Sequence, residues 1–328
     1  MFRPASHSSQ AHRGDVDWGS HHQWQWRGQQ CHWRELGEVH HPPLVLIHGF
    51  ATGCGHWRRN AEALAAAGWR VYGLDLVGFG ASSQPGHLRL DNRLWARQVH
   101  AFLQDVVQQP AVLVGHSLGG LVALTCSVFF PEEVRAVIAT PLPDPTLLMA
   151  SPQDAERAGR RPPWRRKSKK RLVELLCRIL PLELLVPLLA RSPVLEWAIQ
   201  TAYRAPVQQD ERLHRIIGAP ARRRGAVQSL RAMSVAMALR PIKATAPNLL
   251  RRLQHPMLLI WGEQDLLVPL QVGWQCQRFR KDLAVTVIPE SGHCPHDERP
   301  EVFNAVVIAW LEHMGTYREG VLGPLTNP

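Results

Sequence analysis

Short apolar runs that alternate with helical stretches constrain the fold of this chain more than any other feature. Six runs are rich in Val, Ile and Leu: LVLIHG (44–49), RVYGLDL (70–76), AVLVGHS (111–117), VRAVIAT (134–140), MLLIWG (257–262) and AVTVIPESGH (284–293). They lack a regular alternation of apolar and polar residues, as expected of parallel strands buried on both faces of a sheet. Helical stretches lie between them, for example at 57–68 and 92–107. This order predicts an α/β fold with a doubly wound, mostly parallel sheet.

Other segments depart from that rhythm, and a chain of 328 residues has room for one large α/β domain with an insertion. The stretch at 24–36 alternates aromatic and polar residues around a glycine, which predicts a hairpin at the sheet edge. Residues 141–255 are basic and punctuated by proline, and we interpret them as a helical cap inserted into a core of residues 21–140 and 256–314. We expect a disordered N-terminal tail at 1–20 and a short C-terminal tail at 315–328.

The basic excess of the chain lies within the predicted cap. Residues 151–255 hold 22 Lys and Arg against 7 Asp and Glu, and the rest of the chain holds 16 against 20. The densest runs are RRPPWRRKSKKR (160–171) and ARRRG (221–225). No nucleic-acid-binding signature accompanies them, so we do not expect nucleic acid as a partner. Two alternatives stay open: a solvated surface, or contact with an anionic membrane surface.

Targeting and redox signals are weak. The opening residues lack the apolar core of a secretory signal, and the six cysteines form no CxxC pair. The Leu-rich stretch at 172–190 contains three charged residues and two prolines, so we do not expect it to span a bilayer. We expect a cytoplasmic protein with reduced thiols, peripheral attachment to a membrane being the alternative. No GxGxxG motif is present, so no nucleotide cofactor is expected.

The segment GHSLG fits the G-x-S-x-G pattern between a strand and an apolar helix. Glycines on both sides allow the strained turn that lifts the hydroxyl of Ser117 above the sheet edge, which predicts a nucleophile. The backbone amide of Leu118, at the start of the helix, can face a developing oxyanion. After the first predicted strand, the backbone amide of Phe50 can supply the second donor, and we expect His48 to brace the loop rather than to catalyse.

A nucleophilic serine needs a base that is oriented by a third group. The stretch SGHCPHDERP (291–300) offers two histidines, and His293 comes first after its strand, so we predict that His293 is the base. His296 is interpreted as a structural residue at the entrance of the next helix. A zinc site needs three or four converging ligands, which neighbours in sequence cannot easily supply, so no metal is expected.

The acid is expected after the MLLIWG run, where a carboxylate would reach the same sheet edge. Asp265 is the preferred candidate, and Glu263 and Asp144 are its competitors.

The motifs HGF, GHSLGG, WGEQD and SGH occur in the order typical of the α/β-hydrolase superfamily, which the chain resembles over residues 24–311. Residues 48–85 and 291–304 look more narrowly like pheophytinases and chlorophyll-dephytylating esterases, which cleave the phytyl ester of chlorophyll-type pigments. His116 departs from that branch, because pheophytinases tend to carry Asn there. A serine at the elbow disfavours the similar haloalkane dehalogenases and epoxide hydrolases, which use aspartate.

We therefore predict a serine hydrolase without a cofactor that cleaves a hydrophobic ester, such as a phytyl or another long-chain ester, through an acyl-enzyme. Leucines at helical spacing between 172 and 189 need an apolar partner, which is either the core of the cap itself, the preferred interpretation for most of them, or the roof of a pocket above Ser117. The alternatives are a C–C bond hydrolase or a perhydrolase-like enzyme with the same triad, and a non-catalytic hydrolase-like binding protein.

Overall fold

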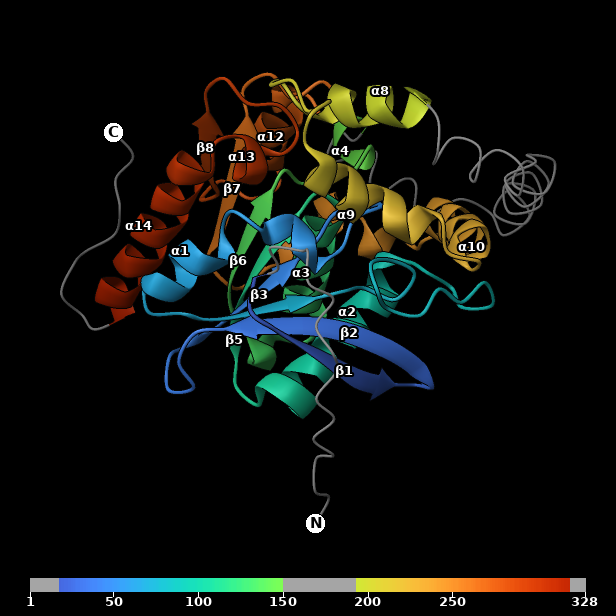
Figure 1. Cartoon of the computed structure of the whole chain (residues 1–328). Coiled ribbons are helices and arrows are strands. Elements are labelled where there is room, and N and C mark those ends of the chain that lie inside the picture. Colours follow the sequence, from blue (N-terminus) through green and yellow to red (C-terminus); the bar gives the residue numbers. More distant parts are fainter. Residues whose placement is uncertain (1–17, 150–192, 319–328) are drawn as a thin grey trace, which may run out of the picture.

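Eight strands form one sheet within residues 18–149 and 193–318, the part of the chain that the computed structural model describes (Figure 1). Their order across the sheet is β1-β2-β4-β3-β5-β6-β7-β8. In chain order the strands are β1 (Ser20–Trp26), β2 (Gln29–Leu36), β3 (Pro43–Ile47), β4 (Arg70–Leu74), β5 (Ala111–His116), β6 (Val134–Thr140), β7 (Met257–Gly262) and β8 (Ala284–Ile288). All pairings from β4 across to β8 are parallel, and β1 and β2 form an antiparallel hairpin at one edge. The predicted doubly wound, mostly parallel sheet is confirmed.

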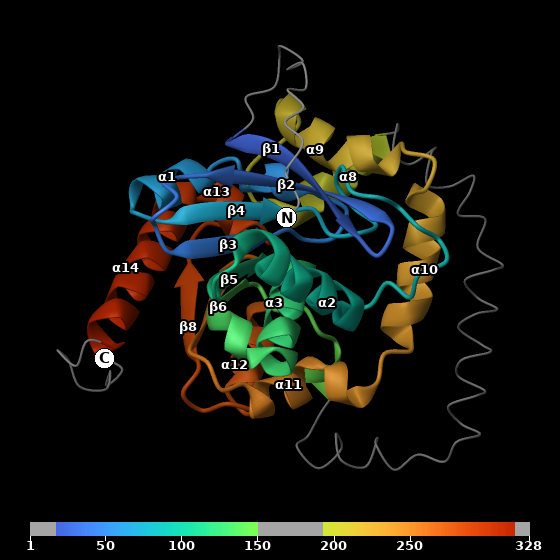
Figure 2. The same cartoon turned by 90° about the horizontal axis from the view of Figure 1, so that it is seen from below.

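Helices cover both faces of the sheet (Figure 2). One face packs against α2 (Asn92–Phe102), α3 (Leu118–Phe129), α11 (Ala246–Arg252) and α12 (Leu270–Cys276). The other packs against α1 (Ala61–Ala66) and α14 (Pro300–Arg318). Every residue of β3, β5 and β7 is buried, because an apolar cluster lies on each side of the sheet. This double burial explains why these strands read as continuous apolar runs.

Shorter helical turns complete the connections. They are η1 (Cys54–Trp57), η2 (Leu103–Val107), η3 (Pro131–Glu133), η4 (Ile242–Ala244) and α13 (Pro295–Glu298). The loops after β3, β5, β7 and β8 all leave the carboxyl edge of the sheet, because these strands are parallel. The HGF and GHS segments, Asp265 and His293 are therefore brought to one edge.

The region between β6 and β7 is mostly helical where it is described. It contains α4 (Thr146–Met149), α8 (Pro193–Ala202), α9 (Glu211–Ala221) and α10 (Ala226–Ala238), and α8 lies beyond the carboxyl ends of the strands (Figure 1). The basic run at 160–171 and the Leu-rich stretch at 172–190 lie outside the described residues. The proposed cap reached residue 255, but α11 buries Leu249 and Leu250 in the cluster that holds α3, so this helix is part of the core.

The fold extends beyond both predicted ends of the core. Trp18 is buried, and its indole N–H donates to the carbonyl of Cys54 (3.1 Å), so part of the segment predicted to be a tail packs against the core. At the other end α14 continues to Arg318, past residue 314. Among the described helices, none combines the length and the apolar character needed to cross a membrane.

Candidate active site

Ser117 lies at a strained turn between β5 and α3. Its backbone angles are φ 50° and ψ −116°, a region that a residue with a side chain rarely adopts. The surrounding glycines are required by space. A Cβ on Gly115 would lie 2.3 Å from the carbonyl carbon of Gly119, and a Cβ on Gly119 would lie 2.2 Å from the carbonyl oxygen of Ile47. The turn is therefore packed tightly against the end of β3, as the G-x-S-x-G pattern predicts.

The structure brings Ser117, His293 and Asp265 into one hydrogen-bonded series. His293 Nε2 lies 3.0 Å from Ser117 Oγ, and His293 Nδ1 lies 2.8 Å from Asp265 Oδ2. The other carboxylate oxygen of Asp265 accepts the backbone N–H groups of Leu267 (2.9 Å) and Val268 (2.8 Å). Because the carboxylate accepts from Nδ1–H, the Nε2 atom is left as an acceptor for the serine hydroxyl. This tautomer can remove the proton from Ser117.

The competing acids are engaged elsewhere. Asp144 is buried and accepts from the guanidinium of Arg240 (2.7 Å) and from the backbone N–H of Ala246 (2.7 Å). Glu263 is exposed, and its carboxylate lies 3.4 Å from the backbone nitrogen of Glu290. Asp265 is therefore the carboxylate that the fold places on His293.

His48 has the bracing contacts that the sequence suggested. Its Nε2 accepts the backbone N–H of Leu76 (3.0 Å), and its Nδ1–H donates to the carbonyl of Gly49 (2.7 Å). These bonds tie the loop after β3 to the loop after β4. They position Phe50, whose side chain is half exposed and packs edge-on against Phe79 at 5.9 Å between ring centroids.

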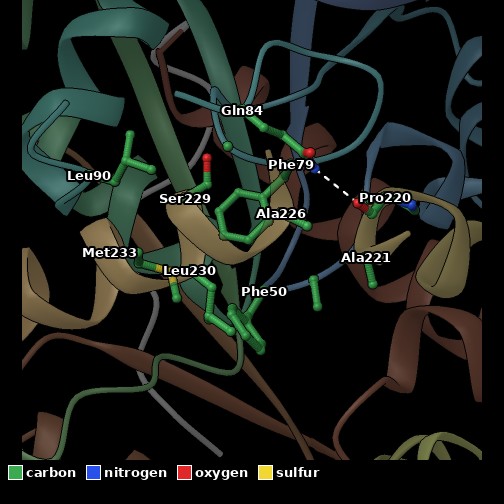
Figure 3. A pocket seen from close by; sticks show the side chains of 12 residues that line it. Phe50, Phe79, Gln84, Leu90, Pro220, Ala221, Ala226, Ser229, Leu230 and Met233 are labelled. Atoms are coloured by element: carbon green, nitrogen blue, oxygen red, sulfur yellow. Dashed lines mark hydrogen bonds between the residues drawn. The ribbon is translucent and has the colours of Figure 1, made fainter. Parts of the chain in front are cut away.

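An apolar cavity that is partly open to solvent adjoins Phe50 (Figure 3). Its walls come from the loops after β3 and β4 and from α9 and α10: Phe50, Ala51, Gly78, Phe79, Gln84, Leu90, Pro220, Ala221, Ala226, Ser229, Leu230 and Met233. The polar side chains at its wall donate to backbone carbonyls, Ser229 to Pro85 (3.1 Å) and Gln84 to Pro220 (3.0 Å). Apart from Gln84 Oε1, which is buried without a hydrogen-bond partner, the remaining surface is apolar and suits a hydrocarbon group.

Two groups of described residues lie close enough together to be considered as metal ligands. The nitrogens of His56, His116 and His296 lie within 4.8 Å of one another, and all three side chains are buried. For two of these three rings, His56 and His296, the direction of the hydrogen bonds can be assigned. The hydroxyl of Tyr203 donates to Asp297 (3.0 Å), so it accepts from His56 Nε2 (2.7 Å), and His56 Nδ1 then accepts from His296 Nε2 (3.3 Å). We interpret this group as a hydrogen-bonded chain rather than a metal site.

The second group consists of His32, Cys54 and Asp75. His32 Nδ1 donates to Asp75 Oδ2 (2.9 Å), and the sulfur of Cys54 lies 3.8 Å from the same nitrogen. The Asp75 carboxylate also accepts the backbone N–H groups of Cys54 (2.6 Å) and Ala81 (2.8 Å). Its lone pairs are used by protein donors, which is the arrangement of a loop brace.

Burial keeps the histidines beside the site neutral. It lowers the pKa of His56 to about 4, although the nearby Asp297 carboxylate opposes the shift. Burial, reinforced by repulsion from His116 and His56, lowers the pKa of His296 well below its usual range. His296 lies at the start of a short helix, as the sequence suggested, but its ring contacts His56 from another element rather than its own loop.

A sequence model of the Alpha/beta hydrolase family matches residues 44–306, most of the chain. The chain belongs to this family. One relative with a similar sequence is the bifunctional epoxide hydrolase 2 of Mus musculus. It is 37% identical to this chain over 123 residues, which cover 36% of this chain and 22% of that protein. The chain thus matches about a fifth of the length of that relative.

Other relatives align over most of this alpha/beta hydrolase. The (lyso)-N-acylphosphatidylethanolamine lipase of Homo sapiens is 27% identical over 276 residues, or 81% of this chain and 78% of that protein. The crystal structure of a membrane phospholipase A, described as a bacterial virulence factor, superimposes with a TM-score of 0.66 at 24% identity and covers 90% of this chain and 86% of its own. An esterase from Thermogutta terrifontis gives a TM-score of 0.65 at 20% identity over 90% and 99% of the two chains. At these identities the solved structures show the fold alone.

Proposed function

We propose that this alpha/beta hydrolase is a serine hydrolase that cleaves the ester bond of a hydrophobic substrate. The observation that supports it most directly is the hydrogen-bonded series from Ser117 through His293 to Asp265. A serine stands at the strained elbow, where epoxide hydrolases use aspartate, and this favours acyl transfer over epoxide opening. The series has the order of contacts that activates a serine nucleophile.

In the proposed reaction His293 Nε2 takes the proton of Ser117 as its oxygen attacks the ester carbonyl. The oxyanion that forms is stabilised by the backbone N–H groups of Phe50 and Leu118, the latter in the first turn of α3. His293 then gives its proton to the leaving alcohol, and an acyl-enzyme remains on Ser117. Water, deprotonated by the same histidine, releases the acid. Asp265 stabilises the imidazolium in both halves of the reaction.

The substrate class follows from the wall of the cavity. Phe50 links the two parts of the site, because its backbone is the proposed oxyanion donor and its ring lines the cavity. A pocket with this lining gains about 0.8 kcal/mol for each methylene that it buries. We therefore propose long-chain or isoprenoid esters as substrates, and the phytyl ester suggested by the pheophytinase-like segments is the most specific candidate.

A C–C bond hydrolase remains the second candidate because it would use the same triad. The 2-hydroxy-6-oxononadienedioate/2-hydroxy-6-oxononatrienedioate hydrolase of Pseudomonas sp is 25% identical over 82% of this chain and 87% of its own length. Its substrate name gives a dicarboxylate, and burial of a carboxylate against an apolar wall is unfavourable without paired charges. The lining found here favours the ester.

A fluorophosphonate probe tests the nucleophile. The wild-type chain should be labelled at Ser117, and Ser117→Ala should not be labelled although it folds. Equal labelling of the two proteins, or none of either, contradicts a serine hydrolase and leaves the non-catalytic binding protein as the alternative.

A panel of esters tests the substrate. Turnover should rise from acetate to long-chain and phytyl esters, with a dicarboxylate C–C substrate as the comparison. A clear preference for acetate esters contradicts the hydrophobic substrate class.

A further inference from the structure

Both backbone polar groups of His293 are held by other elements. Its N–H donates to the carbonyl of Ala202 (2.8 Å), the last residue of α8 in the inserted region. Its carbonyl oxygen lies 3.1 Å from Nε2 of His116, the last residue of β5 and the direct neighbour of Ser117. The proposed base is thus attached to the inserted region on one side and to the nucleophile turn on the other.

The His116 ring must donate through Nε2 in order to bond this carbonyl. His116 is buried, and burial, together with repulsion from the neighbouring His293 and His56 rings, lowers its pKa well below the usual range. A neutral ring adds no positive charge beside His293, whose own ring centroid lies 5.2 Å away. A charged side chain here would oppose formation of the imidazolium on His293.

The ring also touches the oxyanion loop. Nδ1 of His116 is buried without a hydrogen-bond partner, and a Cβ on Gly49 would lie only 2.5 Å from it. Gly49 directly precedes Phe50, one of the two proposed oxyanion donors. The imidazole therefore fills the space between the oxyanion loop and the loop that carries His293.

A second set of contacts fixes the other end of the His293 loop. The carboxylate of Asp297 accepts from the guanidinium of Arg58 (2.9 and 2.8 Å) and from the hydroxyl of Tyr203. Glu298 accepts the backbone N–H of Gly292 (2.8 Å) and that of Arg204. Residues 202–204 thus support the loop at several points.

We infer that His116 is a positioning residue for the base: its Nε2–H fixes the His293 carbonyl and so holds His293 Nε2 within reach of Ser117 Oγ. This inference rests on the proposed function of the triad. Because His116 directly precedes Ser117 within G-x-S-x-G, this hydrogen bond fixes the position of the base relative to the nucleophile. Because a displacement of about 1 Å at a reacting group can lower a rate by about 10²-fold, loss of this bond should be visible in turnover.

A length-matched pair of substitutions isolates the hydrogen bond. In His116→Gln the side-chain amide nitrogen occupies the place of Nε2 and can donate, whereas His116→Met has similar length and no donor. We expect His116→Met to lower kcat and the rate of fluorophosphonate labelling together, by about 10- to 100-fold, with KM within about twofold of wild type. His116→Gln should stay within about fivefold of wild type in both rates. Thermal unfolding shows whether each variant is folded at the assay temperature.

A purely structural role predicts a different result, in which both variants melt earlier and have equal kcat while folded. That result overturns the inference. His116→Leu, which also lacks a donor, replaces His116→Met if that variant does not fold. It should lower kcat and labelling together at unchanged KM, and rates equal to those of His116→Gln would overturn the inference. Absence of labelling in the wild-type chain has a separate meaning, because it refutes the serine-hydrolase proposal itself and the inference with it.

Discussion

The buried histidines around the site should make the fold sensitive to acid. His56 has an ordinary pKa of 6.5 when unfolded, and burial lowers it to about 4 in the folded chain. Burial shifts the pKa of His48, His116 and His296 in the same direction. A lowered folded pKa means that the unfolded chain takes up protons first. The stability from these neutral rings is therefore complete above about pH 6.5 and is lost progressively as the pH falls toward the folded pKa.

The size of the effect can be worked out for His56. At pH 5 the unfolded imidazole is almost fully protonated and the folded one is almost fully neutral, so unfolding takes up nearly one proton. The free energy of unfolding then falls by about 1.4 kcal/mol per pH unit. Integration from pH 7 to pH 5 gives a loss of about 2 kcal/mol for this residue. Against a total stability of about 5–15 kcal/mol this is a large share, and the other buried histidines add to it.

Urea unfolding at pH 7, 6 and 5 measures the loss, and a difference between variants removes the contribution of all other groups. His56→Gln deletes one titrating ring, so its loss between pH 7 and 5 should be smaller than that of wild type by about 2 kcal/mol. His40→Gln is the matched control, because His40 is exposed. Equal losses in wild type and His56→Gln would refute the reasoning, whatever the absolute stabilities.

Three further predictions concern the site and its surroundings. His293→Ala should lower turnover by several orders of magnitude and Asp265→Asn by about 10⁴-fold, whereas His296→Ala should cost far less than His293→Ala; the reverse order would show that the base is misassigned. In the cavity, Leu230→Trp should lower kcat/KM for long-chain esters by about fourfold for each methylene displaced and leave kcat/KM for acetate esters unchanged. Ala238→Trp, an exposed position on the same helix, is the control. A uniform loss for all esters would contradict the proposal that the cavity binds the hydrocarbon chain. The basic inserted region should bind anionic but not zwitterionic liposomes, and binding that does not weaken with salt would contradict an electrostatic membrane contact.

The sequence predicted correctly those features that depend on one contiguous segment of the chain. The elbow serine could be predicted because its glycines, its strand and its helix are contiguous, and the strands could be found because both of their faces are buried. Strand ends were less accurate: the predicted run at 284–293 ends as a strand at Ile288, because the chain turns there toward His293. The boundary of the inserted region was placed by the break in the strand rhythm, the prolines and the basic charge, and α11 carries exposed Arg251 and Arg252 on a helix whose opposite side is core.

The support of the base could not be predicted in this way. His116 lies at a position defined by the motif, but its partner is a backbone carbonyl 177 residues away. Every residue has a backbone carbonyl, so the sequence does not show which one a side chain will bond. His56 and His296 meet across 240 residues without any local pattern. The leucines at 172–189 lie outside the described residues, and the cavity that the described residues form is lined by the loops after β3 and β4 and by α9 and α10. Such contacts depend on how distant elements pack, and only the fold reveals them.

The proposed role of His116 in positioning the base and its contribution to acid sensitivity can be separated by one substitution. The ring must be neutral to donate through Nε2 without repelling His293, and the burial that keeps it neutral weakens the fold in acid. An amide donates a similar hydrogen bond and does not titrate.

His116→Gln should therefore retain fluorophosphonate labelling near the wild-type rate while its stability falls less steeply below pH 6.5, by up to about 1.4 kcal/mol per pH unit. Labelling rates and urea midpoints measured on the same preparations check both halves. If the variant is as acid-sensitive as wild type, His116 is not among the groups that take up a proton on unfolding; if labelling collapses, the ring does more at this position than donate one hydrogen bond.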